Sequence, residues 1–251
     1  MTVRGRVIVA LAVLLPLVAA CGTPAPTATP IPTPTPQPIV TEKVSFVTED
    51  GVTLSGTLFP GGGDLAVVLA HQGAGQPSQK SWHTFATLAA QRGFTALPFD
   101  FRSDFGGPLD RDVVAAVRFL RRRGYTRIAC IGASMGGTSC LVAALTEELA
   151  GVGVIGSDWS TGGGLTLEPA DLAALTMPKL FVTTDNDRFT GIPAVMKSIY
   201  KQAPEPKQFQ EYPGTAHGTE IFGTKYRDDF RALLMGFLDG LRTLKPTAGG
   251  S

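Results

Sequence analysis

Apolar and polar residues follow two different periods along most of this chain. Between 43 and 59, apolar residues alternate with polar ones on both sides of the turn Glu49-Asp50-Gly51, and this pattern predicts a β-hairpin. Further along, short continuous apolar runs such as "LAVVLA" at 65–70 are typical of strands buried on both faces of a sheet. Longer segments such as 109–124 repeat apolar residues every three or four positions, which predicts amphipathic helices.

The predicted strands and helices alternate after the hairpin. Strands are predicted at 65–70, 94–100, 127–132, 152–157, 179–184 and 206–213. Helices are predicted at 79–93, 109–124, 135–151, 192–203 and 224–241. This alternation implies a mostly parallel sheet with helices on both faces and right-handed crossovers, with the hairpin adding antiparallel strands at one edge. The predicted class is therefore α/β, in one domain spanning 41–242.

The first forty residues have a different composition. Arg4 and Arg6 precede the apolar stretch 7–20, which is shorter than the roughly 20 residues of a membrane-spanning helix. The stretch ends in "LVAAC", which resembles the lipobox of bacterial lipoproteins. That resemblance implies a signal peptide at 1–20, cleaved before Cys21, with a diacylglycerol on the Cys21 thiol. A plain secretory signal is the alternative.

Residues 21–40 alternate proline and threonine, so they cannot bury a core and are expected to form an extended tether. The expected protein is lipid-anchored on the cell membrane and faces the extracytoplasmic side, and 243–251 form a frayed tail. The formal net charge of the whole chain is +1, which gives no electrostatic reason to expect a nucleic-acid partner. The basic run 121–123 ends a predicted helix, where positive charge complements the helix dipole.

Ser134 lies between two glycines in "GASMG", where a predicted strand turns into a predicted helix. Such a turn is strained, and side chains at Gly132 or Gly136 would collide with the adjoining strand and helix. In parallel sheets, ligands bind outside the carboxyl ends of the strands, which is where this junction falls. Ser134 is therefore a candidate nucleophile.

From about 41 to 242 the chain resembles an α/β-hydrolase, and it is most similar to the compact dienelactone-hydrolase-like esterases. That family orders its catalytic triad serine, acid, histidine along the chain. The stretch "PKLFVTTDNDRF" is similar to the family's acid strand and turn, which implies Asp187 as the acid and leaves Asp185 as the alternative. The stretch "YPGTAHG" is similar to the turn after the last strand and implies His217 as the base.

The resemblance also implies an oxyanion hole made of two backbone N–H groups. One belongs to Met135, the residue after the nucleophile, and the other to the loop "AHQGAGQ", at Gly73 or, as second candidate, Gln72. The chain departs from the family at two points. Gln72 stands where many relatives have glycine, and Ser134 stands where dienelactone hydrolases have cysteine, which favours ordinary carboxylic esters as substrates.

Several other residues receive structural interpretations. His71 is expected to brace the oxyanion loop, and His83 to lie at the surface where a helix starts. Asp100 and Arg102 resemble a structural pair that relatives carry at this position. The three histidines lack metal-ligand spacing, and "GAG" at 73–75 lacks the third glycine of a dinucleotide site, so no metal and no cofactor is expected.

Cys130 and Cys140 flank Ser134 on the predicted strand and helix. Both are expected to be small buried hydrophobic residues rather than partners in a disulfide.

The expected activity is that of a serine hydrolase that cleaves carboxylic esters with short acyl groups, carried either by small molecules or by polymers. Residues 158–178 can supply only a short helix after a glycine-rich loop, so no cap domain is expected. Asp158 and Trp159 are candidates to line the pocket, and simple packing is the equal alternative for Trp159. A peptide or amide hydrolase of the same fold and a tethered binding domain without turnover remain the alternative functions.

Overall fold

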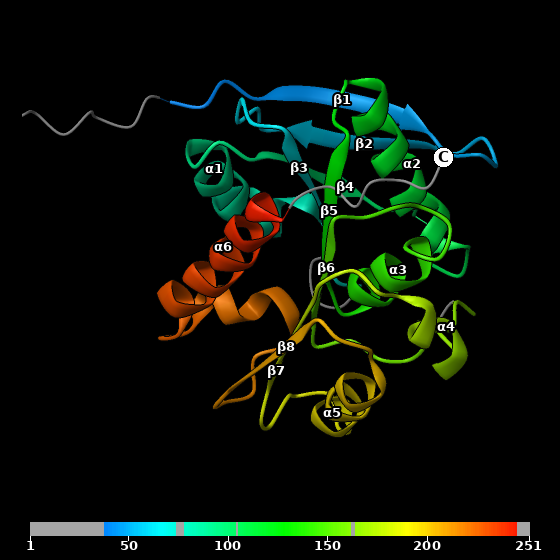
Figure 1. The fold of residues 1–251 in the computed structure, drawn as a ribbon, viewed down its shortest axis with the longest axis vertical. Coiled ribbons are helices and arrows are strands. Elements are labelled where there is room, and N and C mark those ends of the chain that lie inside the picture. The colour runs from blue at the N-terminus through cyan, green and yellow to red at the C-terminus, as the bar shows by residue number, and fades with distance from the viewer. Residues whose placement is uncertain (1–37, 74–77, 104, 162–163, 245–251) are drawn as a thin grey trace, which may run out of the picture. The chain divides into compact units, whose positions relative to one another are not determined.

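The predicted strands form one mixed sheet of eight strands in the computed structural model (Figure 1). The strand order is β1-β2-β4-β3-β5-β6-β7-β8. The strands are β1 (Glu42–Val47), β2 (Thr53–Leu58), β3 (Leu65–Ala70), β4 (Thr95–Asp100), β5 (Arg127–Ala133), β6 (Gly151–Ile155), β7 (Lys179–Thr184) and β8 (Lys207–Tyr212). β1 pairs with β2 and β2 with β4 in antiparallel fashion, and all other neighbours are parallel. The predicted α/β class, with an antiparallel hairpin at one edge, is confirmed.

The structure describes residues 38–73, 78–103, 105–161 and 164–244, which belong to one compact unit. The predicted signal peptide at 1–20, Cys21, nearly all of the predicted tether and most of the predicted tail lie outside the described residues. None of the helices in the described ranges is long and apolar enough to cross a membrane.

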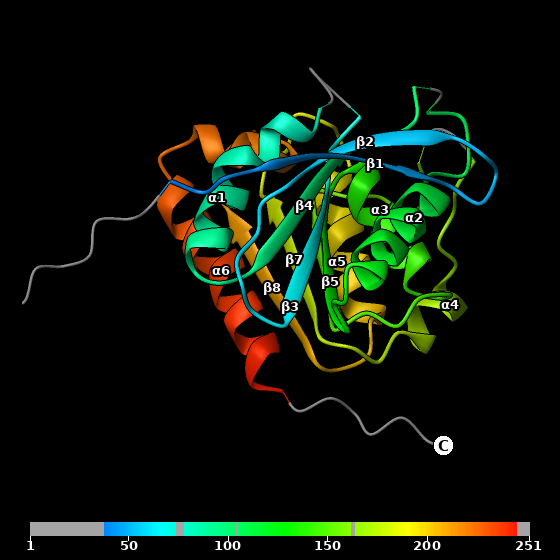
Figure 2. The ribbon, with the colours of Figure 1, turned by 90° about the horizontal axis from the view of Figure 1, so that it is seen from above.

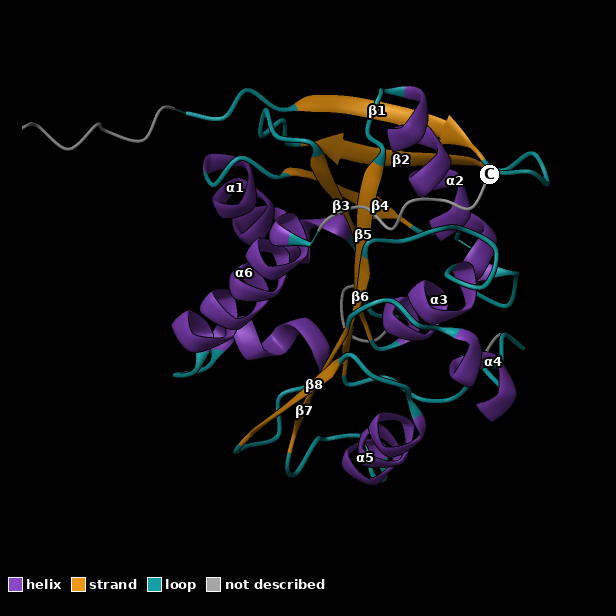
Figure 3. Ribbon diagram, viewed as in Figure 1, coloured by secondary structure: helices purple, strands orange, loops and turns teal. Residues whose placement is uncertain are grey.

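Helices cover both faces of the sheet, as Figures 2 and 3 show. The α-helices are α1 (His83–Gln91), α2 (Leu109–Arg122), α3 (Met135–Ala143), α4 (Pro169–Ala174), α5 (Ile192–Gln202) and α6 (Arg227–Thr243). Two 3-10 helices, η1 (Gln79–Trp82) and η2 (Gly218–Gly223), lie before α1 and before α6. Helices α1 and α6 pack on one face, and α2, α3 and α5 on the other.

β3 shows why continuous apolar runs appear in the sequence. Ala66, Val68 and Ala70 contribute to the core under α2 and α3, whereas Leu65, Val67 and Leu69 contribute to the core under α1 and α6. Both faces of the strand are buried, so every position along it is apolar.

Helix α3 is shorter than the predicted helix 135–151. It ends at Ala143, and a series of turns follows. The backbone N–H of Thr146 donates to the carbonyl of Ala143, which tightens the chain into a turn. Glu147 is then drawn inward to ion pairs with Arg118 and Arg121 of α2. This tertiary attraction of charges overrides the local helical pattern.

The carboxyl ends of β5, β7 and β8 lie at the same edge of the sheet, because these strands are parallel. Between β6 and β7 the described residues contain a single short helix, α4, after the isolated bridge between Ser160 and Thr166. The described residues of this segment, 158–161 and 164–178, form no large cap, in agreement with the expectation from the sequence.

Candidate active site

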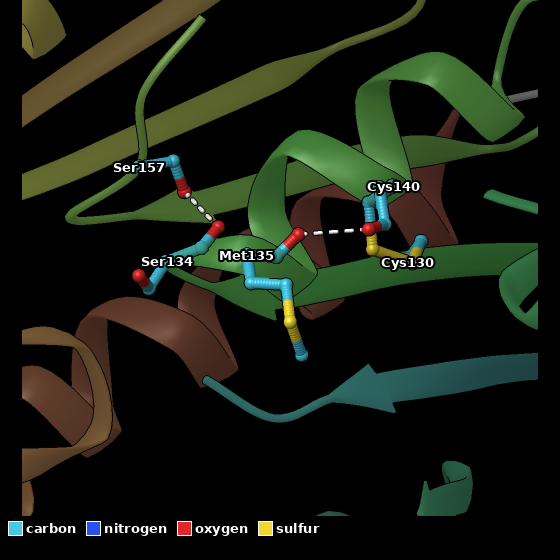
Figure 4. Close-up of a disulfide and its surroundings, with 6 residues drawn as sticks. Cys130, Ser134, Met135, Cys140 and Ser157 are labelled. Atoms are coloured by element: carbon cyan, nitrogen blue, oxygen red, sulfur yellow. Dashed lines mark hydrogen bonds between the residues drawn. A yellow bond between two sulfur atoms is a disulfide. The ribbon is translucent and has the colours of Figure 1, made fainter. Parts of the chain in front are cut away.

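Ser134 joins the end of β5 to the start of α3 in a strained conformation. Its φ and ψ are 52° and −123°, and no other non-glycine residue in the described ranges has a positive φ. The Ser134 N–H donates to the carbonyl of Ile155 at 2.7 Å, and its carbonyl accepts the hydroxyl of Ser157 at 2.8 Å (Figure 4). Strain of this kind persists only where surrounding contacts over-determine it, and it clusters at functional sites.

The glycines around Ser134 allow β5, α3 and the loop after β3 to approach one another closely. A Cβ on Gly132 would lie 2.2 Å from the carbonyl oxygen of Gly136. A Cβ on Gly136 would lie 2.5 Å from the carbonyl oxygen of Ala70. Any side chain at these two positions would therefore collide with backbone, as the sequence predicts.

Cys130 of β5 and Cys140 of α3 form a disulfide, so the expectation of two unpaired cysteines is wrong. Their Cα atoms are 5.8 Å apart, within the normal range for a disulfide. The close approach of Gly132 to Gly136 folds α3 back onto β5, which brings the two cysteines together. Figure 4 shows the disulfide on the far side of the turn from the Ser134 side chain.

His217 and Asp187 form a buried pair, 1% and 6% exposed, in the loops after β8 and β7. The Nδ1 atom of His217 lies 2.9 Å from Oδ2 and 3.0 Å from Oδ1 of Asp187. An ionised carboxylate only accepts hydrogen bonds, so Nδ1 carries the proton and Nε2 is left as the basic nitrogen. The alternative acid, Asp185, instead accepts the backbone N–H of Gly214 at 2.9 Å.

Three residues around His217 were not singled out from the sequence. Phe189 places its ring edge-on to the imidazole, with centroids 4.5 Å apart, and its N–H donates to Asp187. Glu220 accepts the backbone N–H of His217 at 3.0 Å and forms an ion pair with Arg188. The three-residue spacing of His217 and Glu220 is that of a capping box, which is the signal that could have revealed Glu220.

The residues of the predicted oxyanion hole lie next to one another. Met135 is the first residue of α3, where backbone N–H groups have no partner within the helix. A Cβ on Gly73 would lie 3.1 Å from Sδ of Met135, so the loop after β3 packs against the start of α3. The carboxamide oxygen of Gln72 accepts the backbone N–H of Thr219, two residues after His217.

His71 is buried and fixes the main chain of the same loop. Its Nε2 accepts the N–H of Phe101 at 3.2 Å, so its Nδ1 carries the proton and donates to the carbonyl of Gln72 at 2.8 Å. Burial lowers the pKa of His71, which keeps the ring neutral. These contacts are those expected of a brace between the loop after β3 and the end of β4.

The remaining candidates make structural contacts. Asp100 accepts hydrogen bonds from Gln79, and Arg102 binds Asp112 and Asp50, so Asp100 and Arg102 each have partners of their own. His83 packs edge-on against Phe59. Asp158 is exposed, and Trp159 is partly buried against the core under α2 and α3. Within the described residues, no three His, Cys, Asp or Glu side chains are grouped in a way that could hold a metal ion.

Comparisons with known proteins agree with this fold. The sequence model described as "Alpha/beta hydrolase family" matches residues 67–246. No curated protein sequence matches the chain. Among solved structures, an esterase from Pyrococcus furiosus is similar with a TM-score of 0.67 and 17% identity, over 80% of this chain and 91% of the other. A dienelactone hydrolase from Anabaena variabilis is similar with a TM-score of 0.68 and 21% identity, over 80% and 98%.

Proposed function

Since this chain belongs to the alpha/beta hydrolase family, we propose that it is a serine hydrolase that cleaves carboxylic esters through an acyl-enzyme. The observation that carries the proposal is the strained turn at Ser134 together with the buried His217–Asp187 pair, on loops that share one edge of the sheet. The two are brought together through their neighbours in the chain, because a Cβ on Gly218 would lie 3.2 Å from Cβ of Ala133. The fold alone would not suffice, because one fold hosts many functions.

In the proposed reaction, Nε2 of His217 takes the proton from Ser134 Oγ while Oγ attacks the ester carbonyl carbon. The C–O bond to the alcohol then breaks, and the alcohol leaves with the proton that His217 returns. Water attacks the acyl-serine by the same path and releases the acid. Asp187 holds the ring tautomer and stabilises the imidazolium through its two short contacts to Nδ1.

The negative charge of the tetrahedral intermediate requires fixed hydrogen-bond donors. The proposed donors are the backbone N–H groups of Met135 and of Gly73, with Gln72 as the alternative to Gly73. The packing of Gly73 against the Met135 side chain supports this assignment.

The proposed substrates carry short acyl groups. Only the six-residue helix α4 lies in the described part of the segment between β6 and β7, so little apolar surface is available to cover a long chain. Each methylene left in water forfeits about 0.8 kcal/mol of binding free energy. A higher kcat/KM for butyrate than for palmitate esters, measured in monomeric solution, is expected. A clear palmitate preference would contradict this part of the proposal.

We further propose a lipid anchor on Cys21, with the folded domain outside the cytoplasmic membrane. β1 and β4 both run antiparallel to β2, so β1 begins at the edge of the sheet opposite Ser134. Glu42, the first residue of β1, pairs there with Arg123 at the end of α2. A tether joined at this edge would leave Ser134 facing away from its attachment point. After lysis, the wild-type protein should fractionate with membranes, whereas the Cys21→Ser variant should be found in the soluble fraction.

The experiment that tests the reaction is active-site labelling with a fluorophosphonate probe. Wild type and the control Ser198→Ala, a half-buried serine of α5 whose hydroxyl accepts a hydrogen bond from Gln202, should label and hydrolyse a butyrate ester, whereas Ser134→Ala should do neither. A wild-type protein that binds esters without labelling or turnover would refute the proposal and favour a binding domain. Hydrolysis of amides in preference to esters would instead point to a peptide or amide hydrolase.

A further inference from the structure

The side chain of Gln72 joins two loops that are far apart in sequence. It is 6% exposed, and its Oε1 accepts the backbone N–H of Thr219 at 2.8 Å and the Thr219 hydroxyl at 3.1 Å. Thr219 is also buried and lies two residues after His217. One carboxamide oxygen therefore holds the turn that carries the proposed base.

The turn after His217 is shaped around this carboxamide. Gly218 has a φ of +57°, a conformation that favours glycine. A Cβ on Gly218 would lie 2.3 Å from Oε1 of Gln72 and 3.2 Å from Cβ of Ala133, the last residue of β5. The chain can pass this close to Gln72 only because residue 218 has no side chain.

The main chain of Gln72 is fixed independently of its side chain. Its carbonyl accepts the Nδ1 proton of His71, and His71 is in turn held by the backbone N–H of Phe101. The next residue, Gly73, packs against Met135. The backbone of Gln72 thus belongs to the proposed oxyanion loop, and its side chain reaches the turn of the proposed base.

We propose that the Gln72 side chain is a positioning residue that sets His217 at the correct distance from the oxyanion loop. This inference rests on the proposed function. Proton transfer and oxyanion stabilisation occur in the same transition state, so a shift between the two loops lowers kcat more than it raises KM. Sub-ångström misplacement of a catalytic group is enough for a large effect.

Gln72→Met tests the inference because it keeps the length of the side chain and removes the oxygen acceptor. Two buried donors of Thr219 lose their partner, and kcat is expected to fall roughly 10- to 100-fold with little change in KM. The matched control is Gln210→Met in β8, where the side-chain amide donates to the neighbouring carbonyl of Glu211 and kcat should stay at the wild-type level.

Gln72→Glu supplies a second readout, the pH dependence of kcat/KM. The carboxylate retains both acceptor bonds, so kcat at high pH should recover most of what Gln72→Met loses. It also adds a negative charge beside the turn of His217, where Asp187 and the Glu220–Arg188 pair already lie. Negative charge favours the protonated imidazole, so the acid limb of the kcat/KM profile should move to higher pH.

Thr219→Val keeps the test decisive if Gln72→Met fails to fold. It removes only the hydroxyl donor, leaves the 2.8 Å backbone bond, and should lower kcat roughly 2- to 5-fold. A folded Gln72→Met with kcat within twofold of wild type, or a loss confined to KM, would overturn the inference. An unchanged Thr219→Val together with an unfolded Gln72→Met would overturn it as well. None of these results bears on the proposed function, which fails if wild type is inactive or if Ser134→Ala is active.

Discussion

Removing the Cys130–Cys140 disulfide should lower the free energy of unfolding by an amount set mainly by the length of the loop that the bond closes. The bond closes a loop with a sequence separation of 10 residues that contains Ser134. Both cysteines are fully buried, so the perturbation is the double substitution Cys130→Ala with Cys140→Ala, which introduces no polar group into the core. Each single substitution also breaks the bond and leaves one free thiol.

The magnitude follows from the entropy that the bond removes from the unfolded chain. For a loop of about ten residues, the chain-entropy relation gives roughly 9 cal/mol/K, or about 2.7 kcal/mol at 25 °C. Each buried sulfur that is replaced by a hydrogen costs about another 0.8 kcal/mol, as a lost methylene does. Each single variant should therefore lose about 3.5 kcal/mol of unfolding free energy, and the double variant about 4.3 kcal/mol.

The assay is urea unfolding of wild type and the three variants, followed by tryptophan fluorescence and circular dichroism. Because both single variants lose the same bond, their effects should not add, and the cycle should give a coupling of about 2.7 kcal/mol. The Tm of the double variant should lie roughly 10 °C below that of wild type. Activity at 25 °C should persist, because Ile155 and Ser157 still hold the main chain of Ser134.

Two results would contradict the predicted stabilisation of the protein by the disulfide. Additive single effects of about 1 kcal/mol each would show that the cysteines act only as packing groups. The same conclusion would follow from a thiol assay on denatured Cys21→Ser protein without reducing agent. Two free thiols in that assay would show that Cys130 and Cys140 are not bonded to each other.

The other predictions concern the site and its support. Asp187→Asn should lower kcat roughly 10³- to 10⁴-fold, whereas Asp185→Asn should stay within a few-fold of wild type in ester hydrolysis; equal effects would contradict the assignment of the acid. Gly136→Ala should destabilise by about 3 kcal/mol or more in urea unfolding, because its Cβ would lie 2.5 Å from the carbonyl oxygen of Ala70. Burial lowers the pKa of Lys179 to about 8 from 10.5, so the unfolded chain binds more protons between these values. The free energy of unfolding of wild type should therefore rise relative to Lys179→Met from pH 8 to 10.5, and a flat difference would show that Lys179 is not perturbed.

Local patterns predicted the strands well because burial on both faces requires continuous apolar runs, as in 65–70. They failed for the second half of the predicted helix 135–151, where the fold supplies the attraction between Glu147 and the two arginines of α2. The helical pattern predicted for 135–151 carries no information about charged residues on another helix.

The same distinction applies to the candidate site. The sequence could indicate Ser134 because the chemistry of its turn is local, and His217 because "YPGTAHG" is similar to the turn after the last strand of the family. It left Asp185 open beside Asp187, since only the tertiary structure reveals which carboxylate lies against the imidazole. It also missed the contact between Gln72 and Thr219, which joins two loops with no shared sequence signal.

The most direct measurement of the central claim is mass spectrometry of the protein during turnover of a butyrate ester. After acid quenching and proteolysis, a butyryl group is expected on the peptide that contains Ser134, at the Ser134 hydroxyl, and none is expected in His217→Ala quenched at the same time. Acylation at another residue, or turnover at the wild-type rate with no acyl group on Ser134, would contradict that claim.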